Sequence, residues 1–216
     1  MLAREDYLRR WSALHGGVAP RGMVGGWLSV VYRMARPLAS TGVPPDAVTL
    51  TGLVVCLLVL PAAAAGGGWL LLGVVAVVAG AALDGLDGAV ALLTGRVSRW
   101  GFLLDSVCDR VADAAFVAAL WFTGTPGWLC AAGGALAWLH EYVRARAAAG
   151  GVGDIAVVTV GERPTRVIVT AMFLLGAALY PAAADRWATA GATAWVLTGA
   201  VGLAQLLVAV RSRMRA

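Results

Sequence analysis

Two neighbouring apolar segments of this chain, each long enough to cross a lipid bilayer, contain the aspartates Asp84, Asp87, Asp105 and Asp109. An aspartate at the centre of a membrane helix costs roughly 2.5–3.5 kcal/mol, so four cost on the order of 10 kcal/mol unless something offsets their charge. Two divalent cations would balance the four negative charges, and ligands that are all oxygen favour Mg²⁺ or Mn²⁺ over Zn²⁺. The sequence therefore predicts a site for two metal ions between two helices.

The acids recur with small residues at intervals of three or four positions, which places them on one face of each helix. The first face carries Asp84, Asp87, Gly88 and Ala91, and the second carries Gly101, Asp105, Asp109 and Asp113. The interleaved glycines favour a ligand site. The alternative is that the acids only line a polar seam or an ion path. Asp113 is predicted to support the ligands from behind or to pair with an arginine.

The composition places the chain in a membrane. Its 216 residues are 60% hydrophobic with a mean hydropathy of +0.80, which indicates an integral membrane protein. The net charge is +5, and arginines on the cytoplasmic side explain it better than nucleic-acid binding, because no aromatic–basic motif is present. The three cysteines form no C-x-x-C pair, so neither a zinc site nor a disulfide framework is predicted. His15 and His140 lack ligand spacing and are predicted to be structural.

The apolar pattern predicts an all-α integral membrane protein with six transmembrane helices preceded by an N-terminal amphipathic interfacial helix. Each apolar stretch supplies about 20 residues, enough to cross roughly 30 Å of hydrocarbon. Residues 1–40 are predicted to form a cytoplasmic lead and a juxtamembrane helix, and residues 41–216 a transmembrane catalytic domain. The six spans are predicted at about 47–65, 69–93, 101–123, 127–148, 165–183 and 189–210.

The amphipathic helix is predicted over residues 21–40, after a polar lead. Apolar side chains recur there at helical spacing, with arginines off the stripe, which is typical of a helix lying in the membrane interface. The stripe consists of Met23, Trp27, Val31, Met34 and Leu38.

Arginines concentrate in the N-terminus, in the loops 94–100 and 149–164 and in the C-terminus, so both termini are predicted to be cytoplasmic in a plasma membrane. Asp84 lies 15 residues after Trp69, or about 22 Å from the outer surface at ~1.5 Å per residue. Asp105 and Asp109 lie about 8 and 14 Å from the cytoplasmic surface by the same rise. All of these acids are therefore expected to meet in the cytoplasmic leaflet.

The two acidic faces resemble the signature of the CDP-alcohol phosphatidyltransferases, D-x-x-D-G-x-x-A-R followed by G-x-x-x-D-x-x-x-D. Seven of its eight positions agree, and Leu92 stands where the family has an arginine that helps to hold the nucleotide diphosphate. Arg96 or Arg99 would then supply that positive charge. The resemblance implies transfer of a phosphatidyl group from CDP-diacylglycerol to an alcohol, with release of CMP, by a homodimeric membrane enzyme.

The resemblance also implies residue roles. Asp84, Asp87 and Asp105 would hold the metal ions, and Asp109 would be the general base and touch metal as well. The glycines are alternatively helix-packing residues, and Ser98 alternatively an ordinary loop residue. The CDP group would be contacted by Gly88, Ala91, Ser98, Gly101, Pro44, Pro45, Asp46 and Ala47.

A cluster of arginines bears on the acceptor. The stretches YVRARA and GERPTR resemble those of actinobacterial phosphatidylinositol-phosphate synthases, although Ala148 stands where an acid is usual. That resemblance implies an acceptor such as inositol phosphate, whose phosphate would be bound by Arg144, Arg166 and Arg211, with Arg146 beside them. The arginine's planar fork suits phosphate. The alternative reading is that these residues are ordinary cytoplasmic anchors.

Other functions stay open at this point. Glycerol 3-phosphate is the second candidate acceptor. A proton or cation transporter would also use buried acids, but it predicts internal repeats, and none is visible in the sequence. An inactive relative is the third class, supported by Leu92 alone.

Overall fold

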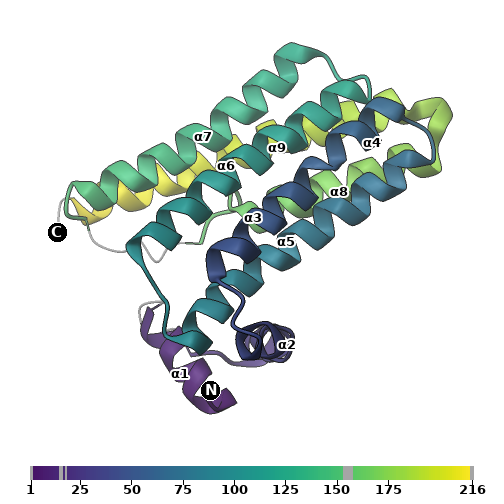
Figure 1. The fold of residues 1–216 in the computed structure, drawn as a ribbon. Coiled ribbons are helices and arrows are strands. Elements are labelled where there is room, and N and C mark those ends of the chain that lie inside the picture. Colours follow the sequence, from purple (N-terminus) through teal and green to yellow (C-terminus); the bar gives the residue numbers. More distant parts are fainter. Residues whose placement is uncertain (1, 15–16, 18, 153–157, 215–216) are drawn as a thin grey trace. The chain divides into compact units, whose positions relative to one another are not determined.

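The computed structural model describes residues 2–14, 17, 19–152 and 158–214, and these residues form helices and no strand (Figure 1). The all-α prediction is therefore confirmed for the described part of the chain. The elements in order are α1 Arg4–Leu14, α2 Gly22–Ser40, α3 Pro45–Leu57, α4 Val59–Ala65, α5 Trp69–Thr94, α6 Arg99–Phe122, α7 Gly127–Ala149, α8 Arg163–Leu179, the 3₁₀ turn η1 Pro181–Ala183, and α9 Ala184–Arg213.

Three segments are long and apolar enough to cross a membrane on length and composition, namely Pro45–Ala65, Gly67–Thr94 and Pro181–Arg213. The predicted spans at 101–123, 127–148 and 165–183 are helical as well, in α6, α7 and α8. They are less apolar or shorter. The first half of α6 carries several charged residues, and α8 has only 17 residues.

The predicted first span is not one continuous helix. It divides at Leu58 into α3 and α4. Pro61 explains the break, because proline has no N–H to donate to the carbonyl four residues earlier. The Leu58 amide instead donates to the Val55 carbonyl at 3.1 Å, in a tighter turn.

The described residues divide into two compact units, one comprising residues 1–54 and 79–109 and the other residues 55–78 and 110–216. The core of the first unit joins α1 and α2 to the start of α3 and the end of α5. Its members are Tyr7, Leu28, Val31, Ala35, Val48, Leu86, Ala89, Val90, Leu92 and Leu93.

Helix α1 is a finding that the sequence pattern did not predict, because residues 1–20 looked like a polar lead. Tyr7 anchors the helix, with only 1% of its surface exposed and its ring 5.5 Å from that of Tyr32. Arg4 adds a hydrogen bond from its guanidinium to Ser29 Oγ at 2.7 Å. The buried Tyr7, with partly buried Leu8 and Trp11 and the Arg4 hydrogen bond, therefore holds this polar helix against the core of the first unit.

The predicted apolar stripe lies along one side of α2, but only part of it is buried in the described structure. Val31 is buried in the core of the first unit with Leu28 and Ala35, whereas Trp27 and Met34 are 54% and 49% exposed. The helix is thus apolar on its core side and also at exposed positions.

In the second unit, α9 makes close glycine contacts with α8 and with the segment that precedes α8. A Cβ on Gly176 would lie 2.4 Å from the Trp187 ring, and one on Gly202 would lie 2.5 Å from the Gly161 amide nitrogen. Only glycine permits these approaches, as in many membrane helix pairs. Trp195 adds a hydrogen bond from Nε1 to Thr170 Oγ1 at 3.1 Å inside this core.

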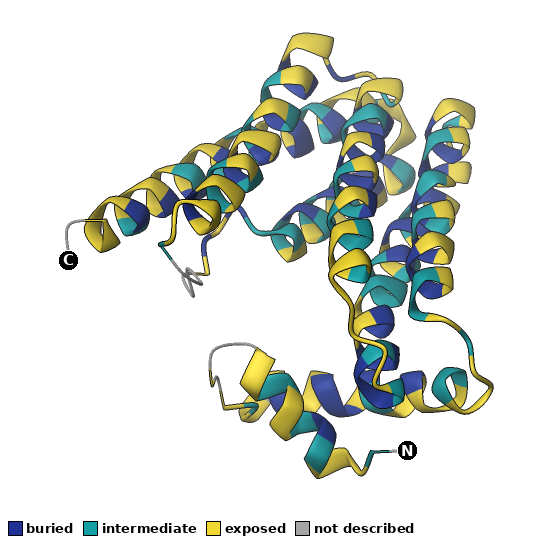
Figure 2. Ribbon diagram, turned by 60° about the vertical axis from the view of Figure 1, so that its left-hand side comes forward, coloured by how far each residue is buried: buried dark blue, intermediate teal, exposed yellow. Residues whose placement is uncertain are grey.

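Exposed positions, yellow in Figure 2, occur along the helices. Many of them are large apolar residues. Phe102, Trp128 and Val208 are each more than 70% exposed. Such extensive apolar exposure is unfavourable in water and is expected where lipid covers the helices.

Candidate active site

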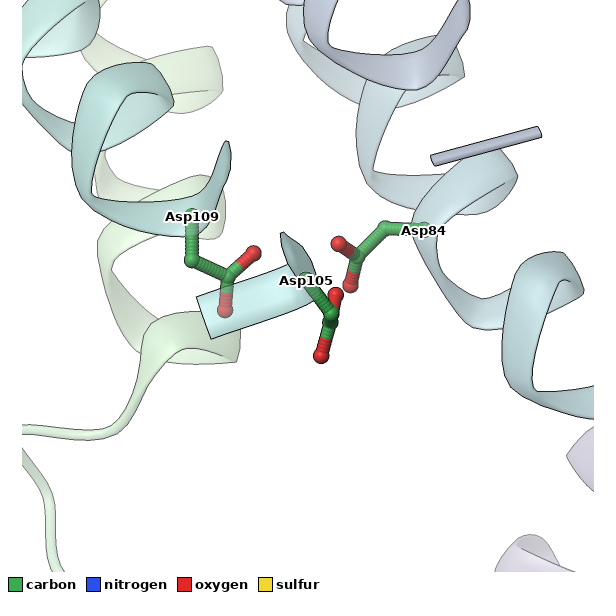
Figure 3. A group of neighbouring side chains, drawn as sticks. All are labelled: Asp84, Asp105 and Asp109. Carbon is green, nitrogen blue, oxygen red and sulfur yellow. The ribbon is translucent and has the colours of Figure 1, made fainter. Parts of the chain in front are cut away.

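Three of the four predicted metal ligands converge. Asp84 projects from α5, and Asp105 and Asp109 project from successive turns of α6, so that the three carboxylates point toward one another (Figure 3). One oxygen from each lies within 4.8 Å of the others, and all three residues are half-buried. We call these residues the carboxylate cluster. Three like charges at this separation repel one another in a half-buried site, and their oxygen donors are those that Mg²⁺ and Mn²⁺ prefer.

Asp87, the fourth predicted ligand, is placed differently. Its side chain is buried, and its carboxylate accepts hydrogen bonds from the Thr49 hydroxyl and from the Gly88 amide. Thr49 was not predicted as a site residue. It lies three positions after Asp46, on the same helical face, and this spacing was the signal that could have identified it.

A pocket of about 180 Å³ adjoins the cluster, with Asp105 and Asp87 in its wall. Six of the eight residues predicted to contact a CDP group line it, and the lining does not include Pro44 or Ala47. Thr49, Val97 and Phe102 contribute as well. The complete lining is Pro45, Asp46, Thr49, Asp87, Gly88, Ala91, Arg96, Val97, Ser98, Gly101, Phe102 and Asp105.

The two glycines of the signature differ in their surroundings. A Cβ on Gly88 would meet nothing within 4 Å, so this glycine has no packing partner and leaves space at the pocket. A Cβ on Gly101 would lie 3.2 Å from Ser98 Oγ. That hydroxyl accepts a hydrogen bond from the Gly101 amide at 2.9 Å, which caps the first turn of α6. Ser98 therefore orders the pocket wall besides lining it.

Leu92 does not face the pocket. It is 7% exposed and belongs to the apolar core of the first unit. Arg96 lines the pocket instead, and its guanidinium donates to the Gly42 carbonyl at 3.4 Å. Arg99, the other candidate for the missing charge, is exposed and is not part of the pocket lining.

The second unit contains a closed set of ion pairs, which we call the ion-pair ring, formed by Arg110, Asp113, Glu141 and Arg166. Asp113 Oδ2 lies 3.1 Å from Arg110 and 3.2 Å from Arg166 Nε. Glu141 Oε1 lies 3.1 Å from each of the same two guanidinium groups. The prediction that Asp113 pairs with an arginine is thus confirmed, whereas the part played by Glu141 was missed.

The predicted phosphate-binding arginines fall into different environments. Arg166 is only 3% exposed, and besides the two carboxylates it contacts the Gly161 carbonyl at 2.8 Å. Arg144 is half-buried and pairs with Glu162. Arg146 and Arg211 are exposed, next to Ala147 and Val210, which pack together in one core cluster. Arg166 therefore differs from the exposed phosphate ligand that its position in the sequence suggested.

His140 is fully buried, and its Nε2 lies 2.9 Å from Thr159 Oγ1. This contact confirms a structural part for His140. His15 lies outside the described residues.

Residues 43–208 match the family model described as CDP-alcohol phosphatidyltransferase. The chain belongs to this family. It is therefore a transferase of phospholipid synthesis, and the carboxylate cluster lies within the matched region.

Among curated relatives of this phosphatidyltransferase, the phosphatidylinositol phosphate synthase of Mycobacteroides abscessus is 35% identical over 201 residues, which are 83% of this chain and 84% of that protein. The archaetidylinositol phosphate synthase of Pyrococcus horikoshii is 35% identical over 141 residues, 63% of this chain and 72% of that protein.

The fold of this phosphatidyltransferase resembles that of the phosphatidylinositol phosphate synthase of Mycobacterium tuberculosis in two crystal structures. The complex with manganese and citrate has a TM-score of 0.69 and 26% identity, over 83% of this chain and 88% of that one. The structure with CDP-DAG bound has a TM-score of 0.64 and 28% identity, over 82% and 94%.

Proposed function

We propose that this enzyme moves the phosphatidyl group of CDP-diacylglycerol to a hydroxyl of a phosphorylated polyol, inositol phosphate above all, and releases CMP. The observation that carries the proposal is the carboxylate cluster beside a pocket lined by six residues of the CDP-contacting set. The relatives support the acceptor. Two synthases named for different lipids, phosphatidyl and archaetidyl, share inositol phosphate in their names. Glycerol 3-phosphate is the second candidate acceptor.

We assign two Mg²⁺ or Mn²⁺ ions to Asp84, Asp105 and Asp109, with Asp87 as a further ligand. The cluster fits such ions because its donors are all carboxylate oxygens within 4.8 Å of one another. When bound, the ions would supply positive charge to a diphosphate and stabilise the departing CMP. Thr49 would hold the Asp87 carboxylate in a fixed orientation through its hydrogen bond.

The protein side chains perform the remaining work. Asp109 accepts the proton of the attacking hydroxyl, as a general base placed on the turn of α6 after Asp105. Gly88 leaves room for the nucleotide, and Ala91, Pro45 and Asp46 form the wall beside it. Pro44 and Ala47 support this wall from the same turn. Arg96 supplies the positive charge that the family arginine would provide at the position of Leu92.

We assign binding of the acceptor phosphate to Arg144, Arg146 and Arg211. Arginine binds phosphate through two parallel hydrogen bonds, and these three side chains are at least partly exposed. Arg166 belongs to the same predicted set, but its guanidinium lies 2.8–3.2 Å from Gly161, Glu141 and Asp113, so it would have to exchange one of these partners to bind phosphate.

The membrane arrangement that fits this chemistry has six spans in the plasma membrane, with the amphipathic helix α2 at the interface and both termini in the cytoplasm. Residues 41–216 form the catalytic domain and residues 1–40 precede it. The exposed Trp27 and Met34 support an interfacial α2, because aromatic and long apolar side chains favour that depth. A homodimer is the assembly that we expect.

A membrane assay with CDP-diacylglycerol tests the proposal, with CMP release measured for a panel of acceptors. Inositol 1-phosphate should give the highest rate and glycerol 3-phosphate the next, whereas inositol, serine and choline should react poorly. A strong preference for an uncharged polyol would contradict the proposed class of acceptor but leave CDP-diacylglycerol as the donor. No CMP release with any acceptor, in the presence of Mg²⁺ or Mn²⁺, would contradict the function as a whole.

A further inference from the structure

Two layers of ion pairs connect α7 with the start of α8. In one layer Arg166 binds Glu141, and in the other Arg144 binds Glu162. Glu141 and Arg144 lie one turn apart on α7, while Glu162 precedes Arg166 by one turn at the N-terminus of α8. The two layers therefore follow each other along both helices.

The layers differ in closure and in exposure. Arg166 belongs to the ion-pair ring, and its side chain is 3% exposed. The outer pair joins Arg144 to Glu162 Oε1, and the two side chains are 28% and 25% exposed. An anion can therefore approach the partly exposed outer pair, whereas Arg166 of the inner layer is buried among its ion-pair partners.

Glu162 also has partners that do not depend on Arg144. The amide and the hydroxyl of Thr159 both lie 3.2 Å from Glu162 Oε1. The Thr159 hydroxyl lies 2.9 Å from Nε2 of the buried His140. The carboxylate consequently keeps hydrogen-bond donors when the guanidinium moves to another anion, which lowers the cost of exchange.

We propose that Glu162 is an internal competitor for the acceptor phosphate and sets the anion selectivity of Arg144. The inference rests on the proposed function. A phosphate dianion carries more charge than a carboxylate and can accept two parallel hydrogen bonds from the guanidinium, so it displaces Glu162. A monocarboxylate has the same charge as Glu162 and gains nothing by exchange. Glu162 thus allows phosphorylated acceptors to bind and disfavours carboxylates. The selectivity arises because a carboxylate gains nothing by displacing Glu162.

The test is Glu162→Gln in the full chain, which keeps the hydrogen bonds to Thr159 and removes the competing charge. The KM for the phosphorylated acceptor should fall by about two- to fivefold, the range expected for a partly exposed ion pair. The turnover number and the KM for CDP-diacylglycerol should stay the same, and acetate should become an inhibitor. An acceptor KM that is unchanged or raised would overturn the proposal, because Glu162 would then merely hold Arg144 in place.

Two controls separate this effect from net charge. Glu5→Gln makes the same change of charge in α1, at an exposed position, and should leave the acceptor KM unchanged. In an Arg144→Gln background, Glu162→Gln should give no further gain, since the pair acts as a unit. A gain of equal size in that background would overturn the proposal.

A binding measurement keeps the test independent of transfer. Inorganic phosphate, compared with chloride at equal ionic strength, should raise the melting temperature of the Glu162→Gln variant at a lower concentration than that of the parent. If no phosphorylated acceptor reacts in the parent, the proposed function fails. The phosphate concentration at half of the melting-temperature rise still tests whether Glu162 competes with phosphate. Equal midpoints for both proteins would overturn it.

Discussion

The carboxylate cluster and the ion-pair ring both place charged side chains among apolar helices, but they compensate the charge in different ways. The cluster gathers three carboxylates whose oxygens lie within 4.8 Å of one another. The ring alternates two acids with two arginines, and one oxygen of each carboxylate lies within 3.2 Å of both guanidinium groups. The ring therefore balances its charge internally, whereas the members of the cluster bear only one sign.

This difference indicates which group is built for a ligand. Like charges held together oppose folding, and a bound cation would offset their repulsion. Alternating charges at ion-pair distance can hold helices together without any ligand. Removing a charge from the cluster should mainly cost activity, and removing one from the ring should mainly cost stability.

The largest effect should come from the cluster and its metal. Chelation by EDTA should abolish CMP release, and Mg²⁺ or Mn²⁺ should restore it. Asp84→Ala should remain inactive at saturating metal, because it removes the ligand that α5 contributes to the cluster. The melting temperature of metal-free Asp84→Ala should not fall below that of the metal-free parent, since a like charge has gone. Full activity in EDTA would contradict a metal site.

The next effect concerns proton transfer. Asp109→Asn keeps the size of the side chain but cannot accept a proton, so turnover should fall by roughly 10²–10⁴-fold. Binding of the CDP-lipid, measured by titration against the variant, should largely persist. Turnover near the parent rate would mean that another group is the base, and a parallel loss of lipid binding would assign Asp109 to the metal alone.

Within the ring, Asp113→Asn should lower the free energy of unfolding by about 3–5 kcal/mol, the usual cost of leaving buried charges without one partner. Asp113 is 2% exposed, so solvent cannot replace it. The matched control is Asp6→Asn, which removes the acid of an exposed ion pair on α1 and should cost less than about 1 kcal/mol. Denaturation in detergent measures both. Equal losses would remove the distinction between the ring and a surface pair.

The sequence predicted the cluster far better than the ring for a physical reason. Asp84, Asp105 and Asp109 occur in helical repeats, so local periodicity alone places them on helix faces. The ring joins three helices, and no local pattern indicates that Glu141 and Arg166 meet. Arg166 was consequently predicted to bind phosphate.

The other departures follow the same rule. The break at Leu58 was readable from Pro61, a local signal, but α1 depends on the burial of Tyr7 against α2, which is a tertiary contact. The hydrogen bond from Thr49 to Asp87 likewise joins two helices. Patterns within one helix were therefore predictable, whereas contacts between helices were predicted only where repeated acids on two neighbouring segments indicated them.

The smallest effect concerns Arg96, which lines the pocket beside the carboxylate cluster. Arg96 lines the pocket and donates to a backbone carbonyl at 3.4 Å, whereas Arg166 is enclosed by carboxylates. A diphosphate can therefore draw on the charge of Arg96, and Arg96→Ala should raise the KM for the CDP-lipid by about three- to tenfold, the value of one hydrogen bond at an exposed position. Arg99→Ala, at an exposed position outside the pocket lining, is the matched control and should leave this KM unchanged. An equal rise in both variants would mean that general surface charge attracts the donor. No rise in either variant would mean that neither arginine replaces the one missing at Leu92. The cations of the cluster would then bind the diphosphate without an arginine.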